Sequence, residues 1–280
     1  MDNQAARSLA GGIDGAQLLG LRWDSTPRSR VRLTNEVVES VADQIIGGQL
    51  PPATLLPSEA VMGESFGVSR TVIRESLKVL ENMGLILKRQ GKLSWTAPHA
   101  SWDLLDPIVL ASRLRHDPDL SFLDDLVTVR AVLESEMAAQ AADRASAEEV
   151  AEIAAQLARL AENLESPERF KSSDADFHAA VMRASHNDIA TTIVAAIQSR
   201  AKASAQYAAT ATPPGLLRLS QKGHVEVLEA IRAHDRAAAA QAMREHIRSA
   251  WTWRQSEPVE SPAQSTGGGA TRRKRAGREE

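Results

Sequence analysis

The sequence predicts a mainly α-helical protein, with a winged helix-turn-helix unit near the N-terminus and an all-α helical bundle after it. Two observations predict this fold class. Residues 34–97 combine three short helical patterns with a hairpin pattern, which is typical of a winged helix. Residues 101–253 carry helical periodicity almost throughout, and Pro, Gly and Asn interrupt it at intervals.

Composition narrows the class of protein. The chain has 280 residues, of which 43% are hydrophobic, so it can form real cores. It has no cysteine, which excludes disulfides, thiolate metal sites and cysteine nucleophiles. The sequence carries neither a membrane-length apolar run nor an export signal, so we expect a cytoplasmic protein without a membrane partner.

We expect four segments along the chain. Residues 1–29 are expected to form a flexible arm, and residues 30–98 the winged-helix domain. Residues 99–254 are expected to form the all-α domain, and residues 255–280 a disordered basic tail rich in Pro, Ser and Gly. Residues 30–97 hold 8 Lys and Arg against 7 Asp and Glu, a net charge of only +1. Net charge alone therefore does not indicate nucleic-acid binding, and the placement of the charges decides it.

The first two helices of the winged-helix domain have recognisable starts. Thr34 is placed to cap a helix over residues 35–47, in which apolar residues recur at helical spacing. The sequence Gly-Gly-Gln-Leu-Pro-Pro then ends that helix. Ser58 is placed to cap a short second helix over residues 59–66, and Gly67 follows as a turn.

The third helix begins after Ser69 and is expected to run to about Met83. Ile73, Leu77 and Leu80 recur at i, i+4 and i+7, which predicts the face that packs into the core. Cationic and hydroxyl side chains lie about 60–160° around the helix from that face. In a helix-turn-helix this N-terminal end enters the major groove, and its backbone N–H groups favour phosphate. For a lone helix, solvated surface charges are the alternative.

A short hairpin follows, with expected strands at residues 85–88 and 93–96. The sequences Leu-Pro-Ser-Glu at 56–59 and Phe-Gly-Val-Ser-Arg-Thr-Val-Ile-Arg-Glu-Ser-Leu-Lys-Val-Leu-Glu-Asn-Met-Gly-Leu-Ile at 66–86 resemble the GntR family of bacterial transcription factors. The resemblance implies a homodimer with a DNA-binding head and a ligand-sensing C-terminal domain. The residues expected to contact DNA are Ser69, Arg70, Thr71, Arg74 and Lys78 on the third helix and Gln90, Gly91 and Lys92 in the hairpin, or wing.

Two departures from the family pattern affect the DNA-binding expectation. Ala60 stands where the family usually has the Arg that follows Leu-Pro-Ser-Glu, so one expected DNA contact is missing. The wing reads Gly-Lys-Leu-Ser at 91–94 instead of Gly-Arg-Gly-Thr, so it lacks the second glycine. We expect DNA binding to persist with an altered sequence preference.

The C-terminal segment predicts a bundle of six or seven helices. Its amphipathic stretches are rich in Ala, and few β-branched runs compete with a helical interpretation. The expected helices cover residues 120–142, 146–165, 169–185, 188–208, 216–233 and 235–253.

Four residues of this bundle have side chains that suit a divalent metal. Asp174 and His178 are four apart, so a helix places carboxylate and imidazole on one face. His224 opens a later helix, and His246 lies late in the next one. Neutral imidazole and carboxylate suit Zn, Ni, Mn or Fe. From spacing alone, packed or surface histidines are the alternative.

The same segment resembles the FCD C-terminal domain of FadR-type GntR regulators. Metal-binding members carry D-x-x-x-H, then H-x-x-[IVL]-x-x-A-I, then a third His, and Asp174, His178, His224 and His246 match these four positions. The resemblance implies a divalent metal that holds a small organic acid. It also implies an effector-binding role for Arg130 and Glu134, which match the family's R-x-x-x-E helix, and more weakly for Asn187. An ordinary ion pair is the alternative for the first two. Asp176, two residues before His178, is expected to point elsewhere.

One short segment points toward a class of acid. Trp-Asp-Leu-Leu-Asp-Pro-Ile-Val-Leu at 102–110 resembles the W-N-L-L-D-P-x-V-L linker of galactonate-regulator-like members, which respond to sugar acids. The function expected from the sequence is thus a dimeric regulator, most simply a repressor, that leaves a palindromic operator when a carboxylic or sugar acid binds. A sensor of the metal ion itself and a metal-dependent enzyme are the alternatives.

Overall fold

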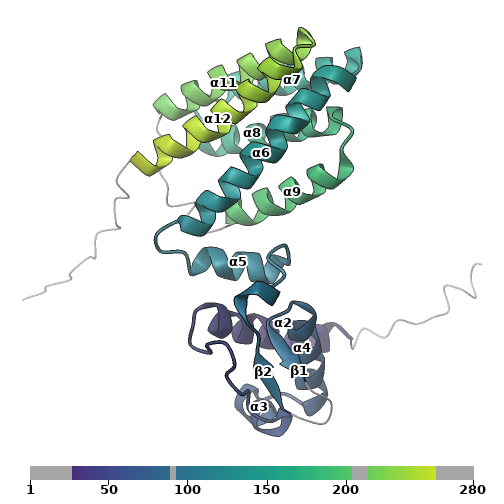
Figure 1. Ribbon diagram of the computed structural model, residues 1–280, viewed down its shortest axis with the longest axis vertical. Helices are drawn as coiled ribbons and strands as arrows, with labels where there is room; N and C mark the ends of the chain where they lie inside the picture. Colours follow the sequence, from purple (N-terminus) through teal and green to yellow (C-terminus); the bar gives the residue numbers. More distant parts are fainter. Residues whose placement is uncertain (1–26, 89–92, 204–213, 257–280) are drawn as a thin grey trace, which may run out of the picture. The chain divides into compact units, whose positions relative to one another are not determined.

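The computed structural model describes residues 27–88, 93–203 and 214–256, and it confirms a mainly helical fold (Figure 1). The described residues divide into two compact units, one up to Pro118 and one from Asp119. The domain boundaries expected from the sequence stay predictions. None of the described helices has the length and apolar character needed to cross a membrane.

The first unit has the helices and strands of a winged helix. Its elements are α2 (Pro27–Ile46), α3 (Glu59–Phe66), α4 (Arg70–Asn82), β1 (Ile86–Lys88), β2 (Ser94–Thr96), the 3-10 turn η2 (His99–Ser101) and α5 (Pro107–Arg115). The strands β1 and β2 pair antiparallel, with Leu87 opposite Trp95. The predicted hairpin is therefore confirmed, while the predicted wing residues Gln90, Gly91 and Lys92 lie outside the described residues.

Local capping explains where two of these helices start. The side chains of Ser58 and Ser69 accept hydrogen bonds from the backbone N–H groups of Val61 and Val72. The predicted cap at Thr34 is wrong, because α2 starts at Pro27 and Thr34 lies inside it. The preceding helical residues from Arg30 are exposed, so they leave no apolar period in the sequence.

The core of the first unit forms where the sequence places it. Ile73, Leu77 and Leu80 of α4 are buried against the apolar face of α2. The helix α5 also packs on α2, and Val109 of α5 belongs to the same core. Ser112 and Arg115 of α5 both donate hydrogen bonds to Asp43 of α2. The segment after η2 is therefore part of this unit.

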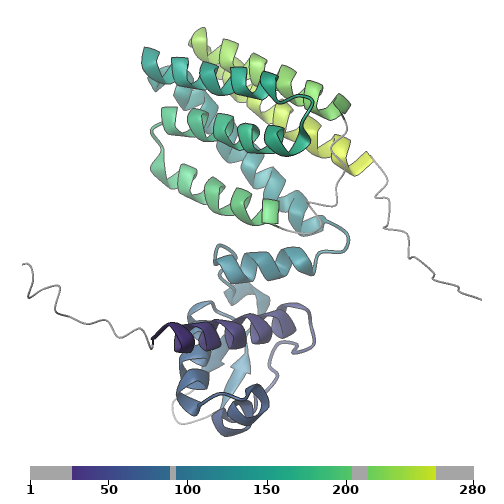
Figure 2. The ribbon, with the colours of Figure 1, turned by 180° about the vertical axis from the view of Figure 1, so that it is seen from behind.

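The second unit is a bundle of long helices. Its elements are α6 (Ser121–Arg144), α7 (Ala147–Glu162), α8 (Pro167–Ala184), α9 (Asp188–Ala203), α11 (Pro214–Arg232) and α12 (Arg236–Ser256). The helix α12 packs along both α6 and α11, and α8 packs between α7 and α9 (Figure 2). Each agrees with a predicted helix to within a few residues, apart from the expected end of α9 at 208, which lies outside the described residues. The bundle brings α8, α11 and α12 together around one point.

Candidate DNA-binding face and candidate metal centre

The N-terminal end of α4 presents polar side chains to solvent. Arg70, Thr71, Arg74 and Lys78 are all exposed, on the side of the helix away from Ile73. Ser69 is exposed too, and its hydroxyl caps the helix. The structure therefore places Ser69, Arg70, Thr71 and Arg74 at the N-terminal end of α4, and Lys78 on the same exposed side about one turn further along.

Arg74 is paired with a carboxylate that the sequence pattern does not reveal as its partner. Its Nη2 lies 3.0 Å from Oε2 of Glu59, at the start of α3. Hydrogen bonding to Arg74 lowers the pKa of Glu59, although burial opposes this. The Nζ of Lys88 on β1 lies 3.9 Å from Oε1 of the same carboxylate. Glu59 thus links α3, α4 and the hairpin.

A groove of about 670 Å³ runs between α3, α4 and the hairpin. Arg70, Arg74 and Lys88 line it, and so does Ala60, where the family usually carries Arg. Cations along a concave surface attract the phosphates of DNA. The electrostatic attraction comes from this local arrangement rather than from the net charge of the unit.

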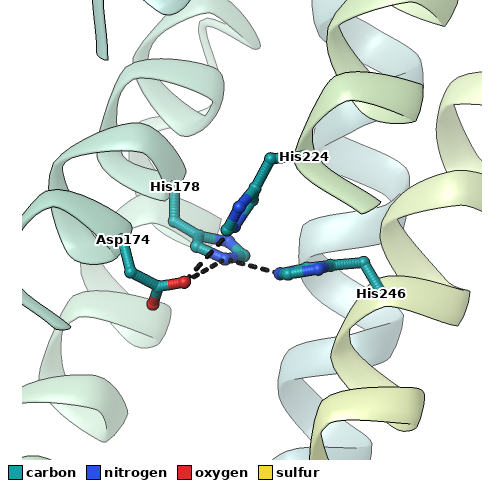
Figure 3. Close-up of side chains that lie close together, drawn as sticks. All are labelled: Asp174, His178, His224 and His246. Carbon is teal, nitrogen blue, oxygen red and sulfur yellow. Dashed lines mark hydrogen bonds and ion pairs between the residues drawn. The ribbon is translucent and has the colours of Figure 1, made fainter. Parts of the chain in front are cut away.

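The four predicted metal ligands converge in the second unit. Asp174 and His178 come from α8, His224 from α11 and His246 from α12 (Figure 3). One ligand atom from each lies within 4.8 Å of the other three. The prediction that these four residues share a site therefore agrees with the geometry, although they are up to 72 positions apart in the chain.

The distances in this cluster are short for groups without a bridging ion. Nε2 of His178 lies 3.2 Å from Nε2 of His246. Oδ1 of Asp174 lies 3.3 Å from Nε2 of His224 and 3.9 Å from Nε2 of His178. The three imidazoles are almost completely buried, and the carboxylate is partly exposed. The cluster therefore opens toward solvent on the side of Asp174.

The electrostatics favour the forms that bind metals. Burial lowers the pKa of both His224 and His246, so their rings are neutral at pH 7. Burial alone would raise the pKa of Asp174, but the close approach of His224, with His178 and His246 nearby, holds it well below its usual range. Neutral nitrogen lone pairs and an ionised carboxylate are the donor set of divalent transition metals.

Several nitrogens of the cluster lack a partner among the described residues. Neither Nδ1 nor Nε2 of His224 has an aligned hydrogen bond, and neither has Nδ1 of His246. Buried polar atoms without partners are costly, and a cation at the centre would satisfy those that face it. The residues present therefore fit a metal ion.

A buried carboxylate orients one of the ligands from behind. Oε2 of Glu134 lies 2.5 Å from Nδ1 of His178, while its Oε1 accepts from Nε of Arg130 at 2.8 Å and from Gln198 at 3.2 Å. Burial alone would raise the pKa of Glu134, but Arg130 and His178 lower it to about 2. Glu134 thus fixes the proton on Nδ1 and leaves the Nε2 lone pair facing the cluster.

The three residues predicted to bind the effector, Arg130, Glu134 and Asn187, do not lie together. Arg130 lines the cavity beside the cluster, whereas Glu134 lies behind His178 and is outside the cavity lining. Asn187 caps α9 by accepting from the backbone N–H of Ala190, and it too is outside that lining. Asp176 is exposed at the cavity mouth, away from the four ligands. Position therefore supports an effector contact for Arg130 but not for Glu134 or Asn187.

Sequence reasoning missed one residue that shapes the cluster. Gly223 on α11 is buried against the ring of His246, and a Cβ there would lie 2.7 Å from Nδ1 of that ring. A glycine in a helix interior costs stability, so its presence immediately before His224 was the available signal.

The cavity beside the cluster has a volume of about 480 Å³, in the range of small-molecule sites. Asp174, His178 and His246 form one part of its wall, and Arg130 lies nearby on α6. The arrangement can bind an anion to Arg130 and to an ion held by the cluster.

Comparison with known proteins agrees with both halves of this description. Residues 33–92 match the family described as "Bacterial regulatory proteins, gntR family", and residues 125–249 match the FCD domain. The galactonate operon transcriptional repressor of Escherichia coli K12 is 31% identical over 209 residues, which span 75% of this chain and 91% of the relative. The chain belongs to the GntR family.

Two further proteins resemble this chain over most of their length. The repressor NanR of Escherichia coli ATCC 8739 is 25% identical over 243 residues, spanning 86% of this chain and 91% of NanR. The solved structure of Lar, described as controlling the agr system of Listeria monocytogenes, has a TM-score of 0.52 at 16% identity. It covers 79% of this chain and 96% of Lar, and it supports the fold. This GntR-family protein is a DNA-binding transcriptional regulator and not an enzyme.

Proposed function

We propose that this regulator is a ligand-responsive repressor, whose operator binding is released by a small acid held at a divalent metal in the C-terminal bundle. The observation that carries the proposal is the convergence of three imidazoles and one carboxylate beside a cavity that also presents Arg130. Repressors among the relatives support the direction of regulation. Such a protein acts in the bacterial cytoplasm, where its operator lies.

Asp174, His178, His224 and His246 would hold the ion, which supplies open coordination positions for a carboxylate oxygen. Glu134 keeps Nε2 of His178 available, and Arg130 grips a second oxygen of the acid through its planar guanidinium. The ligands come from α8, α11 and α12, so a bound acid favours one packing of these helices over another.

DNA recognition is proposed to use the exposed face of α4. A homodimer would present two such helices to a palindromic operator, about one helical turn apart. Arg70, Thr71 and Arg74 would read bases or hold phosphates there. The acid changes operator affinity only through its different affinities for the DNA-bound and free states.

Thermal melting of the full-length protein, loaded with Zn²⁺, Ni²⁺, Mn²⁺ or Fe²⁺ or stripped with EDTA, tests the proposal. A panel of sugar acids and small carboxylic acids is added, because a ligand of the native state raises Tm. We expect an acid-dependent rise that vanishes after stripping. A rise with metal alone and with no acid would favour a metal sensor, and no response to any metal would refute the metal site.

His224→Ala separates the two activities of the protein. It should abolish the response to acid and leave operator binding intact, as measured by fluorescence anisotropy. His186→Asn is the matched control, since His186 is an exposed histidine of the same unit and Asn tolerates its positive φ of 53°. Loss of operator binding in the His224 variant alone would contradict the proposed separation.

A further inference from the structure

The walls of the 480 Å³ cavity differ sharply in character from its acid-binding end. Six of the lining side chains are apolar and buried, and they come from all four helices around the cavity. They are Val127 of α6, Phe170 of α8, Leu216 and Leu217 of α11, and Ile247 and Trp251 of α12.

The buried part of this wall carries few polar groups, because the lining residues Glu168, Lys171, Ser172 and Asp176 are all at least partly exposed. The indole N–H of Trp251 donates to Oδ1 of Asp124 at 2.6 Å, so that residue offers its ring rather than its donor. Among the described lining residues outside the cluster, Ser220 is the one buried polar side chain. Glu168 and Asp176 lie exposed at the mouth.

We infer that the effector is an acid with a hydrocarbon body, and that polyhydroxylated sugar acids are discriminated against. The inference rests on the proposed function, because the carboxylate is taken to bind at the cluster and Arg130. A six-carbon sugar acid brings four hydroxyls beyond its 2-hydroxy acid head. Burying them against an apolar wall leaves them without hydrogen bonds, whereas a hydrocarbon chain needs none.

The sequence feature that suggested sugar acids does not contribute to this cavity. Residues 102–110 belong to the first unit, where Trp102 and Val109 are part of the core around α4. That segment is therefore a feature of the DNA-binding unit's packing. It carries no information about the wall that the body of an effector would touch.

Isothermal titration with acids that share one head group tests the inference. The full-length protein, loaded with the ion that raises its Tm most, is titrated with 2-hydroxyhexanoate, D-gluconate, D-galactonate and glycolate. The first three have the same carbon number and the same 2-hydroxy acid head, and they differ in the hydroxyls of the tail. We expect 2-hydroxyhexanoate to bind at least tenfold more tightly than each of the others.

The titrations distinguish a failure of this inference from a failure of the proposed function. Binding of gluconate or galactonate as tight as that of 2-hydroxyhexanoate overturns the inference and leaves the proposed function standing. Equal binding of glycolate and 2-hydroxyhexanoate also overturns it, because the wall then contributes nothing. If none of the acids binds, or if stripping with EDTA changes nothing, the proposed function fails and the inference fails with it.

A matched pair of variants tests whether the difference in affinity between the acids arises at the apolar wall of the cavity. Val127→Thr keeps the shape of a lining side chain and adds one hydroxyl, so it should weaken 2-hydroxyhexanoate at least threefold and leave glycolate unchanged. Val129→Thr makes the same change at an exposed position of α6 and should alter neither affinity. An equal loss for both acids in Val127→Thr would place the effect at the head group and contradict the inference.

Discussion

Each unit of the molecule contains an arginine paired with a glutamate, and the two pairs have opposite environments. In the first unit Arg74 and Glu59 meet with 63% and 28% of their side chains exposed. In the second, Arg130 and Glu134 meet with 17% and 1% exposed, and Glu134 is also bonded to His178. An exposed pair is worth little and exchanges readily with phosphate, whereas a buried carboxylate holds its partners in place. The first pair suits reversible binding to DNA, and the second suits the fixed geometry of a metal site.

The largest effect is expected from removing the exposed arginine. Arg74→Ala should lower affinity for an operator about 10- to 100-fold, because one base or phosphate contact contributes ~1–3 kcal/mol. The measurement is anisotropy with a DNA fragment selected by the wild-type protein from a random pool. Arg32→Ala, at an exposed arginine of α2, is the control and should change affinity far less. Equal affinities for wild type and Arg74→Ala would mean that α4 does not contact DNA.

The buried pair is expected to act on the metal instead. Glu134→Gln should weaken metal binding about 10-fold or more, because loss of an orienting carboxylate behind a ligand histidine typically costs ~10–100-fold. Competition with a chromophoric chelator measures the affinity, and the absorption spectrum of bound Co²⁺ reports the geometry. Glu136→Gln, at an exposed position of the same helix, is the control. An unchanged affinity and spectrum would refute the orienting role.

Replacing Gly223 by alanine should change the stability of the protein in the direction opposite to the usual one. Gly→Ala within a helix normally stabilises by ~1 kcal/mol, but Gly223→Ala would press a Cβ against the buried ring of His246. We expect Tm to fall by about 2–4 °C or more, as a loss of ~1 kcal/mol does in a domain of this size. Gly215→Ala in the same helix meets only an ordinary contact, 3.6 Å from the Trp253 ring, and should not lower Tm. A higher Tm in Gly223→Ala would contradict the packing described for His246.

The smallest effect is a dependence of stability on pH in the EDTA-treated protein. Burial lowers the pKa of His224 and His246, so between their folded pKa and ~6.5 the unfolded chain binds more protons. Stability is therefore complete above about pH 6.5 and declines as the pH falls below it. Tm measured from pH 8 to pH 5 should decrease on acidification, and His246→Gln should reduce the slope. A Tm that rises between pH 7 and pH 5.5 would contradict this sign.

Much of the fold could be predicted because its signals are local. The caps at Ser58 and Ser69 and the core stripe through Ile73 and Leu77 depend on neighbours within one helix. The start of α2 could not be predicted, because its residues from Arg30 to Leu33 are exposed and show no apolar period.

The candidate metal site also has residues that the sequence indicates and residues that it does not. The four metal ligands match a family motif, so the sequence indicates them despite their separation. The contacts of Glu134 with His178 and of Gly223 with His246 depend on how α6, α8, α11 and α12 pack. No spacing rule predicts which residue of one helix faces a given residue of another, so the sequence assigned Glu134 to the effector and gave Gly223 no role.

The cluster also joins distant parts of the chain. His178 and His246 are 68 positions apart, so an ion bound to both would close a loop of the size that disulfides close in other proteins. By the chain-entropy estimate such a cross-link disfavours the unfolded state by ~4 kcal/mol. Proteases digest the unfolded fraction, so the cellular lifetime of the protein would follow its metal content. Metal starvation would then reduce the number of repressor molecules per cell, in addition to any change in their affinity for DNA.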